Sequence, residues 1–277
     1  MAVRKNQANL SAAERRAFID ALLTLKARGA YDKYVEVHDY FATNDLDDAE
    51  RTGHSAPSFL PWHRKFLLDF ERDLQTVNPS VTLPYWDWTV DRTTTSPMRP
   101  DFLGTTGRAG DSQVMDGPFA YSGGKWKIYL GTDERPFLRR DIGSTDMLPT
   151  AAQVESALSI AHYDEAPWNG RSVGGFRNVL EGWANRNTGP HNAVHRYIGG
   201  AMNSGKSPND PVFWMHHCFI DKLWVEWQRR HPGSGYLPVT PVKDVVALNQ
   251  PMKPWSERGE RITPADMLDH TRFYTYE

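Results

Sequence analysis

The stretch Asp210-Pro-Val-Phe-Trp-Met-His-His-Cys-Phe-Ile-Asp221 opens the strongest helical pattern in this chain of 277 residues. Phe213, His217 and Ile220 recur at intervals of three and four residues, which places them on one face of a helix. Pro211 suits the first turn of a helix, because a backbone N–H in that turn has no partner within the helix. We therefore predict a helix over about residues 211–230, with His217 on its buried face.

The neighbours of His217 take different directions on this helix. His216 points about 100° away from the buried face, so we interpret His217 as a metal ligand and His216 as a packing or supporting residue. Asp221 lies one turn after His217. A carboxylate there could accept the second imidazole N–H and so fix the tautomer that binds a metal.

A pair of histidines precedes this helix. His191 and His195 are four residues apart, so on a helix both imidazoles can reach one metal ion. An isolated pair of histidines at this spacing is more often packed in the core or exposed on a helix surface than bound to a metal ion. This pair is not a zinc-protease motif, because Asn192 stands where the HExxH pattern needs its glutamate. His217 supplies a candidate third ligand.

The N-terminal half contains a matching trio. His63 begins the inner face of a helix predicted over about residues 62–77, His54 lies in the loop before it, and His38 faces inward from a helix predicted over about residues 31–42. Each alone would be a core histidine. Two trios without a carboxylate argue against a di-iron site and favour copper or zinc. We predict two all-imidazole sites on facing helices, close enough to share one dioxygen.

The rest of the chain favours one mainly α domain over residues 1–277. Ser11 and Glu14 fit a capping box before a helix that Gly29 ends. Residues 89–145 are rich in Gly, Pro, Thr and Asp, so we expect a long loop-rich insertion with a short strand pair. Further helical patterning covers about residues 150–160 and 191–197.

Composition and charge exclude several classes of protein. A net charge of -2 gives no electrostatic case for a nucleic-acid partner or an anionic membrane. The apolar stretches are far shorter than the roughly 20 residues of a membrane-spanning helix. The single cysteine, Cys218, excludes an intrachain disulfide framework and any multi-thiolate metal site. No apolar signal segment follows the N-terminus, which by itself predicts a cytoplasmic protein.

Three stretches resemble the signatures of tyrosinases, which are type-3 copper proteins. Residues 54–71, beginning His54-Ser-Ala-Pro-Ser-Phe-Leu-Pro-Trp-His63, resemble the first copper signature, and residues 210–221 resemble the second. The stretch Pro84-Tyr-Trp-Asp-Trp88 between them is also similar to the family. Fungal and plant members link a cysteine to the second histidine of the first site, whereas here Gly53 precedes His54. This difference agrees with the small bacterial tyrosinases.

The resemblance implies a four-helix bundle that holds two copper ions. It also implies ortho-hydroxylation of monophenols such as L-tyrosine and oxidation of o-diphenols such as L-DOPA to o-quinones, with O2 as the second substrate and melanin formation downstream. The implied ligands are His38, His54 and His63 for the first copper and His191, His195 and His217 for the second.

The resemblance also implies roles for residues beside the metals. Glu181 resembles the water-holding glutamate of the family and Asn192 its partner, and together they would polarise a water that acts as the base toward the phenol. Asn192 could instead only form a local hydrogen bond. Arg196 and the loop that contains Ser204 would lie at the mouth of the site, where Arg196 could attract a substrate carboxylate. Trp183 would form a wall of the pocket or belong to the core.

Several alternatives stay open at this point. An o-aminophenol oxidase or a catechol-only oxidase would share these ligands, and so would a haemocyanin-like O2 carrier that is not an enzyme. The resemblance further implies a small copper-delivering caddie protein as a partner. Export of the chain bound to a signal-bearing chaperone of this kind is the alternative to the cytoplasmic prediction.

Overall fold

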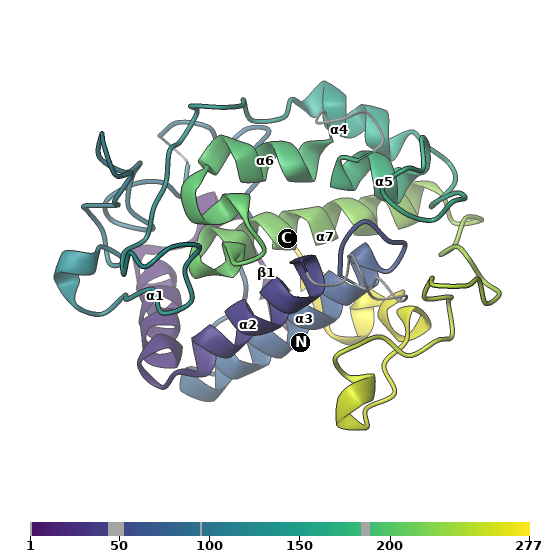
Figure 1. The fold of residues 1–277 in the computed structure, drawn as a ribbon, viewed down its shortest axis with the longest axis horizontal. Coiled ribbons are helices and arrows are strands. Elements are labelled where there is room, and N and C mark those ends of the chain that lie inside the picture. The colour runs from purple at the N-terminus through teal and green to yellow at the C-terminus, as the bar shows by residue number, and fades with distance from the viewer. Residues whose placement is uncertain (1, 44–52, 95, 184–188) are drawn as a thin grey trace.

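The computed structural model describes residues 2–43, 53–94, 96–183 and 189–277. Seven α-helices and two β-strands lie within these ranges (Figure 1). The helices are α1 (Ala12–Ala27), α2 (Ala30–Thr43), α3 (Phe59–Val77), α4 (Ala151–Leu158), α5 (Phe176–Glu181), α6 (Pro190–Ile198) and α7 (Val212–Arg230), and the strands are β1 (Ala2–Arg4) and β2 (Tyr274–Tyr276). The mainly α fold is confirmed.

The predicted ends of the first helix are confirmed. The Ser11 side chain accepts from the backbone N–H of Glu14 at 3.2 Å, and the Glu14 carboxylate accepts from the backbone N–H of Ser11 at 2.8 Å. Gly29 follows the helix with φ +68°, a conformation that glycine adopts without steric cost. By contrast, α3 begins at Phe59 rather than near Trp62, because the first turn also accommodates a proline.

Helices α2, α3, α6 and α7 form the bundle. In Figure 1, α2 and α3 lie below α7, and α6 lies above it. Phe70 of α3 stacks on Trp214 of α7, with ring centroids 3.5 Å apart and planes 7° apart. Tyr34 of α2 meets both rings edge-on. This aromatic cluster packs α2, α3 and α7 against one another.

Two buried ion pairs attach the less regular segments to the bundle. The Arg140 guanidinium donates to both oxygens of Asp210, at 2.6 and 2.7 Å, and so fixes the long insertion to the start of α7. Arg4 of β1 pairs with Glu71 of α3 at 2.8 Å. Because breaking a buried pair leaves an uncompensated charge, both contacts hold their segments firmly.

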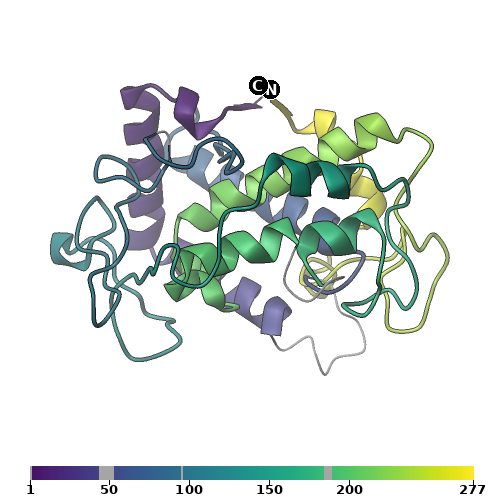
Figure 2. The same ribbon diagram turned by 90° about the horizontal axis from the view of Figure 1, so that it is seen from above.

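The two strands form at positions where no local sequence pattern predicts them. β1 and β2 pair in parallel, so the two ends of the chain lie side by side (Figure 2). The described part of residues 89–145 contains isolated bridges, such as Gly107 with Val114, instead of the expected strand pair. Its Gly- and Pro-rich sequence provides too few consecutive pairing residues for a ladder. Within the ranges given above, none of the helices combines the length and apolar character that a membrane crossing requires.

Candidate metal centre

The first histidine trio is assembled as predicted. His38 projects from α2, His63 from α3, and His54 from the loop between them. One ring nitrogen from each lies within 4.8 Å of the others. The ring centroid of His54 lies 5.0 Å from that of His38 and 4.9 Å from that of His63. Three imidazoles from three segments therefore converge on one point.

Backbone carbonyls determine which nitrogen of each ring is free. His38 Nδ1 lies 2.5 Å from the Gly205 carbonyl oxygen, and His63 Nδ1 lies 2.9 Å from that of Phe59. Because a carbonyl only accepts, each Nδ1 must bear the proton. The Nε2 atoms of both rings are then unprotonated, buried and without a hydrogen-bond partner. Such orphaned acceptors are what a metal ion would satisfy.

The second trio is tighter. His191 and His195 lie one turn apart on α6, and their Nε2 atoms are 3.3 and 3.4 Å from Nε2 of His217 on α7. The Met202 carbonyl accepts from His195 Nδ1 at 2.7 Å, and the Glu181 carbonyl lies 3.2 Å from His191 Nδ1. Nitrogens bound tetrahedrally at about 2.0–2.1 Å from one ion would be roughly 3.3–3.4 Å apart. The spacing thus fits a metal ion.

The two trios adjoin each other across the bundle. The rings of His63 and His217 stack with centroids 4.2 Å apart and planes 13° apart. His54 and His191 have centroids 6.1 Å apart. Two metal ions, one held by each trio, would therefore lie close to each other, as a dinuclear centre requires.

Burial keeps these histidines neutral. It lowers the pKa of His38 to about 3 and that of His195 to about 4. Burial likewise holds the pKa values of His54, His63 and His217 well below the usual range, and neighbouring imidazoles add to the effect. A neutral imidazole offers its lone pair, so the whole set is ready to bind metal at neutral pH.

Comparisons with known proteins agree with this geometry. Residues 28–230 match the family described as the common central domain of tyrosinase. The chain is 58% identical to a tyrosinase of Streptomyces antibioticus, over 100% of both chains. It is 57% identical to a tyrosinase of Streptomyces glaucescens, over 100% of this chain and 99% of that one. This chain belongs to the tyrosinase family.

A solved tyrosinase structure shows the same fold. The tyrosinase from Burkholderia thailandensis superimposes with a TM-score of 0.66 at 17% sequence identity, over 100% of this chain and 73% of that one. The two imidazole trios on a shared tyrosinase fold fit a dinuclear copper centre, since all-nitrogen sites suit copper. The predicted cofactor, a pair of copper ions, is thereby supported for this tyrosinase-family chain.

The prediction for Asp221 is wrong. One of its oxygens accepts from Arg64 at 2.6 Å, and the other accepts from the hydroxyls of Tyr274 and Tyr276 at 2.5 and 2.6 Å. Nδ1 of His217 is buried without a partner. Asp221 instead connects α7 to α3 and to the C-terminal strand, whose position no local pattern indicates.

His216 lies closer to the site than its helical direction predicts. Its candidate ligand atom falls within 4.8 Å of those of His191, His195 and His217. Its ring lies nearly parallel to that of His191, with centroids 5.2 Å apart, and neither of its buried nitrogens has a partner. The assignment of His217 rather than His216 as ligand stays a prediction, which the 3.3 Å contact of His217 supports.

Glu181 and Asn192 both adjoin His191. Glu181 ends α5, a six-residue helix that the sequence interpretation missed. Its side chain is wholly buried, and burial raises the pKa of its carboxyl. The Asn192 side-chain oxygen lies 3.0 Å from His191 Nδ1 and shares that N–H with the Glu181 carbonyl. The sequence signal that could have indicated α5 is the pair of glycines that flank it, Gly175 at its start and Gly182 at its end.

The three predicted substrate contacts lie in different settings. Trp183 is 44% exposed. Arg196 is partly exposed and forms an ion pair with Asp146, at 2.8 Å. The Ser204 hydroxyl donates to the Ala201 carbonyl at 3.3 Å. Their contacts with a phenol stay predictions.

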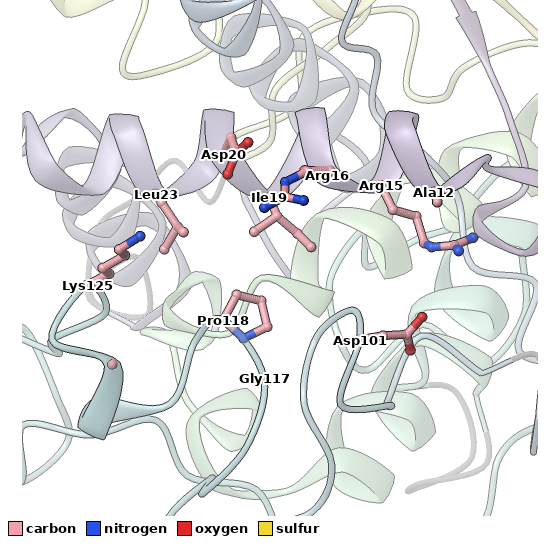
Figure 3. Close-up of a pocket in the computed structure, with 11 residues that line it drawn as sticks. Ala12, Arg15, Arg16, Ile19, Asp20, Leu23, Asp101, Gly117, Pro118 and Lys125 are labelled. Atoms are coloured by element: carbon pink, nitrogen blue, oxygen red, sulfur yellow. The ribbon is translucent and has the colours of Figure 1, made fainter.

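A separate hollow of about 540 Å³ lies between α1 and the loops that contain Asp101 and Pro118 (Figure 3). Arg15, Ile19 and Leu23 of α1 face it, with Lys125 across from them. None of its lining residues is a histidine, so this hollow is not part of the metal centre.

Proposed function

We propose that this chain is a dicopper monooxygenase and oxidase that ortho-hydroxylates monophenols and oxidises o-diphenols to o-quinones with O2. The observation on which this rests is the convergence of two neutral imidazole trios inside a tyrosinase fold. The high identity to tyrosinases over the full chain supports the same activity. L-Tyrosine and L-DOPA are the proposed substrates, with melanin as the end product.

The chain itself has three tasks in this reaction. Bound copper supplies the redox chemistry with O2. The six imidazoles would hold the metals, and the backbone carbonyls behind His38, His63 and His195 fix the tautomers of those three rings. The buried setting excludes bulk water from the reacting groups.

A phenol must also lose its proton, because its pKa lies near 10. We assign this task to a water held by Glu181 and Asn192. The Glu181 carboxylate already accepts from Ser55 N and from Arg177, at 2.6 and 3.0 Å. A carboxylate has about four lone-pair sites, so others remain for a water. General-base catalysis of this kind contributes typically about 10²–10⁴-fold.

Adjacent histidines provide the test of the ligand assignment. His217→Ala is expected to lose the second copper and at least about 100-fold of the activity toward both monophenol and diphenol. His216→Ala, the matched control, is expected to retain two coppers per chain. Copper analysis and oxygen uptake measure both results. A His217→Ala protein with normal copper content and full activity would overturn the assignment.

Substrate range separates the remaining candidates. A catechol-only or o-aminophenol oxidase would leave L-tyrosine unreacted, and a haemocyanin-like carrier would take up O2 reversibly without oxidising any phenol. The family resemblance also supports a small copper-delivering caddie protein and export as a complex with it. Co-production with such a partner should raise the copper content of the isolated chain.

A further inference from the structure

Glu181 contacts both halves of the proposed copper centre through different atoms. Its backbone carbonyl lies 3.2 Å from Nδ1 of His191, in the second trio. Its carboxylate accepts at 2.6 Å from the backbone N–H of Ser55, the residue directly after His54 of the first trio. The proposed water-holding role uses neither of these two contacts.

The backbone at Ser55 needs such a contact. Ser55 has φ +52°, a left-handed conformation that non-glycine residues adopt rarely and keep only where the surroundings hold them there. Ser55 directly follows His54, so its conformation sets the course of the loop that supplies His54. The bond from Ser55 N–H to the buried Glu181 carboxylate restrains that course.

A buried arginine, itself held by a second buried carboxylate, fixes the position of the Glu181 carboxylate. Arg177, one turn earlier on α5, donates to Glu181 at 3.0 Å and to Asp164 at 2.8 Å, and the side chains of all three residues are wholly buried. The segment that contains Asp164 lies directly on the start of α5, since a Cβ at Gly175 would lie 2.7 Å from the Asp164 Cα. Arg177 therefore cannot move without breaking a buried ion pair.

We propose that Glu181 is a positioning residue that sets the two copper sites relative to each other, with Arg177 and Asp164 fixing its carboxylate. The carbonyl orients His191, and the carboxylate fixes Ser55 and hence His54. This inference rests on the ligand assignment made in the proposed function. It adds a task for Glu181 that is independent of any water it holds.

The two contacts respond differently to substitution. A change of the Glu181 side chain leaves its carbonyl in place, so the second site should keep its affinity for copper. The same change releases Ser55, so the first site alone should weaken. Loss of a group that orients a ligand typically reduces metal affinity by about 10–100-fold.

The test measures copper binding, without substrate, by equilibrium dialysis of metal-free protein against Cu(II). In a His195→Ala background only the first site remains, and Glu181→Leu, which removes the acceptor for the Ser55 N–H, is expected to weaken it by at least about 10-fold. In a His54→Ala background only the second site remains, and Glu181→Leu is expected to leave it unchanged. Because phenol oxidation is not measured, failure of the proposed activity would not alter either result.

Glu71 provides a matched control. Its buried carboxylate also accepts from an arginine, Arg4, and from a backbone N–H, that of Leu83, both at 2.8 Å. Glu71→Leu should therefore disturb the fold to a similar extent while leaving both copper affinities unchanged. Arg177→Lys, which keeps the charge but cannot span two carboxylates, should reproduce the Glu181→Leu result if the latter variant does not fold. Equal weakening of both sites, or an unchanged first site, would overturn the proposal.

Discussion

At the scale of single residues, burial makes the metal-free histidines sensitive to acid. A histidine in the unfolded chain titrates near pH 6.5, whereas burial lowers the folded-state pKa of His195 to about 4 and that of His38 to about 3. Between these values the unfolded chain binds more protons, so the free energy of unfolding of the metal-free protein falls as the pH drops from about 6.5 to about 4.

His195 alone would contribute on the order of 2 kcal/mol between pH 7.5 and pH 5. Urea unfolding of the metal-free protein at pH 7.5 and pH 5 measures it, and a His38→Phe variant should show a smaller difference. Equal free energies of unfolding at the two pH values would contradict this account of the site.

Arg196 raises a question of substrate choice at the same scale. Its guanidinium is paired with Asp146 at 2.8 Å, so any substrate carboxylate must compete with that residue. We expect Asp146→Asn to lower the KM for L-tyrosine by about 2–5-fold, since partly exposed ion pairs contribute up to about 1 kcal/mol. Tyramine, which lacks the carboxylate, is the control. An identical change for both substrates would show that Arg196 does not bind the carboxylate.

At the scale of elements, the contact between α5 and α6 depends on two glycines. A Cβ at Gly189 would lie 2.0 Å from the Cα of Gly182 and 2.5 Å from the Val179 carbonyl oxygen. Gly189→Ala must therefore push α6 away from α5 and separate His191 from the Glu181 carbonyl. We expect a loss of about 1–3 kcal/mol in stability together with weaker copper binding at the second site.

Gly123→Ala provides the control for this substitution, because no atom lies within 4 Å of the added Cβ. Thermal unfolding and copper titration of both variants measure the two effects. A Gly189→Ala protein with the stability and copper affinity of the parent would show that the close approach is not required.

The sequence predicts elements well where periodicity is long and regular. The helices that bear His38, His63 and His217 extend over 14 to 19 residues, and their apolar faces identify the inward histidines. The six-residue α5 contains less than two turns, too few to show a period, so Glu181 was found through the family resemblance alone. The prediction that Asp221 orients His217 was wrong for a different reason. The Asp221 carboxylate accepts from Tyr274, which is 53 residues further along the chain, so no local pattern links the two.

At the scale of the whole molecule, the proposed centre exists only when distant segments meet. Its ligands come from α2, α3, α6, α7 and one loop, and the carbonyl behind His38 comes from Gly205, far along the chain. Residue types and spacings predict which side chains bind metal. The carbonyls and the buried charges that orient them depend on tertiary packing, and no local pattern indicates them.

The most direct test of the central claim is copper content measured together with oxygen uptake. Protein reconstituted with Cu(II) is assayed first with L-tyrosine and then with L-DOPA. The account predicts two coppers per chain and oxygen uptake with both substrates. Protein that holds no stable copper, or that holds two coppers and oxidises neither phenol, would contradict it.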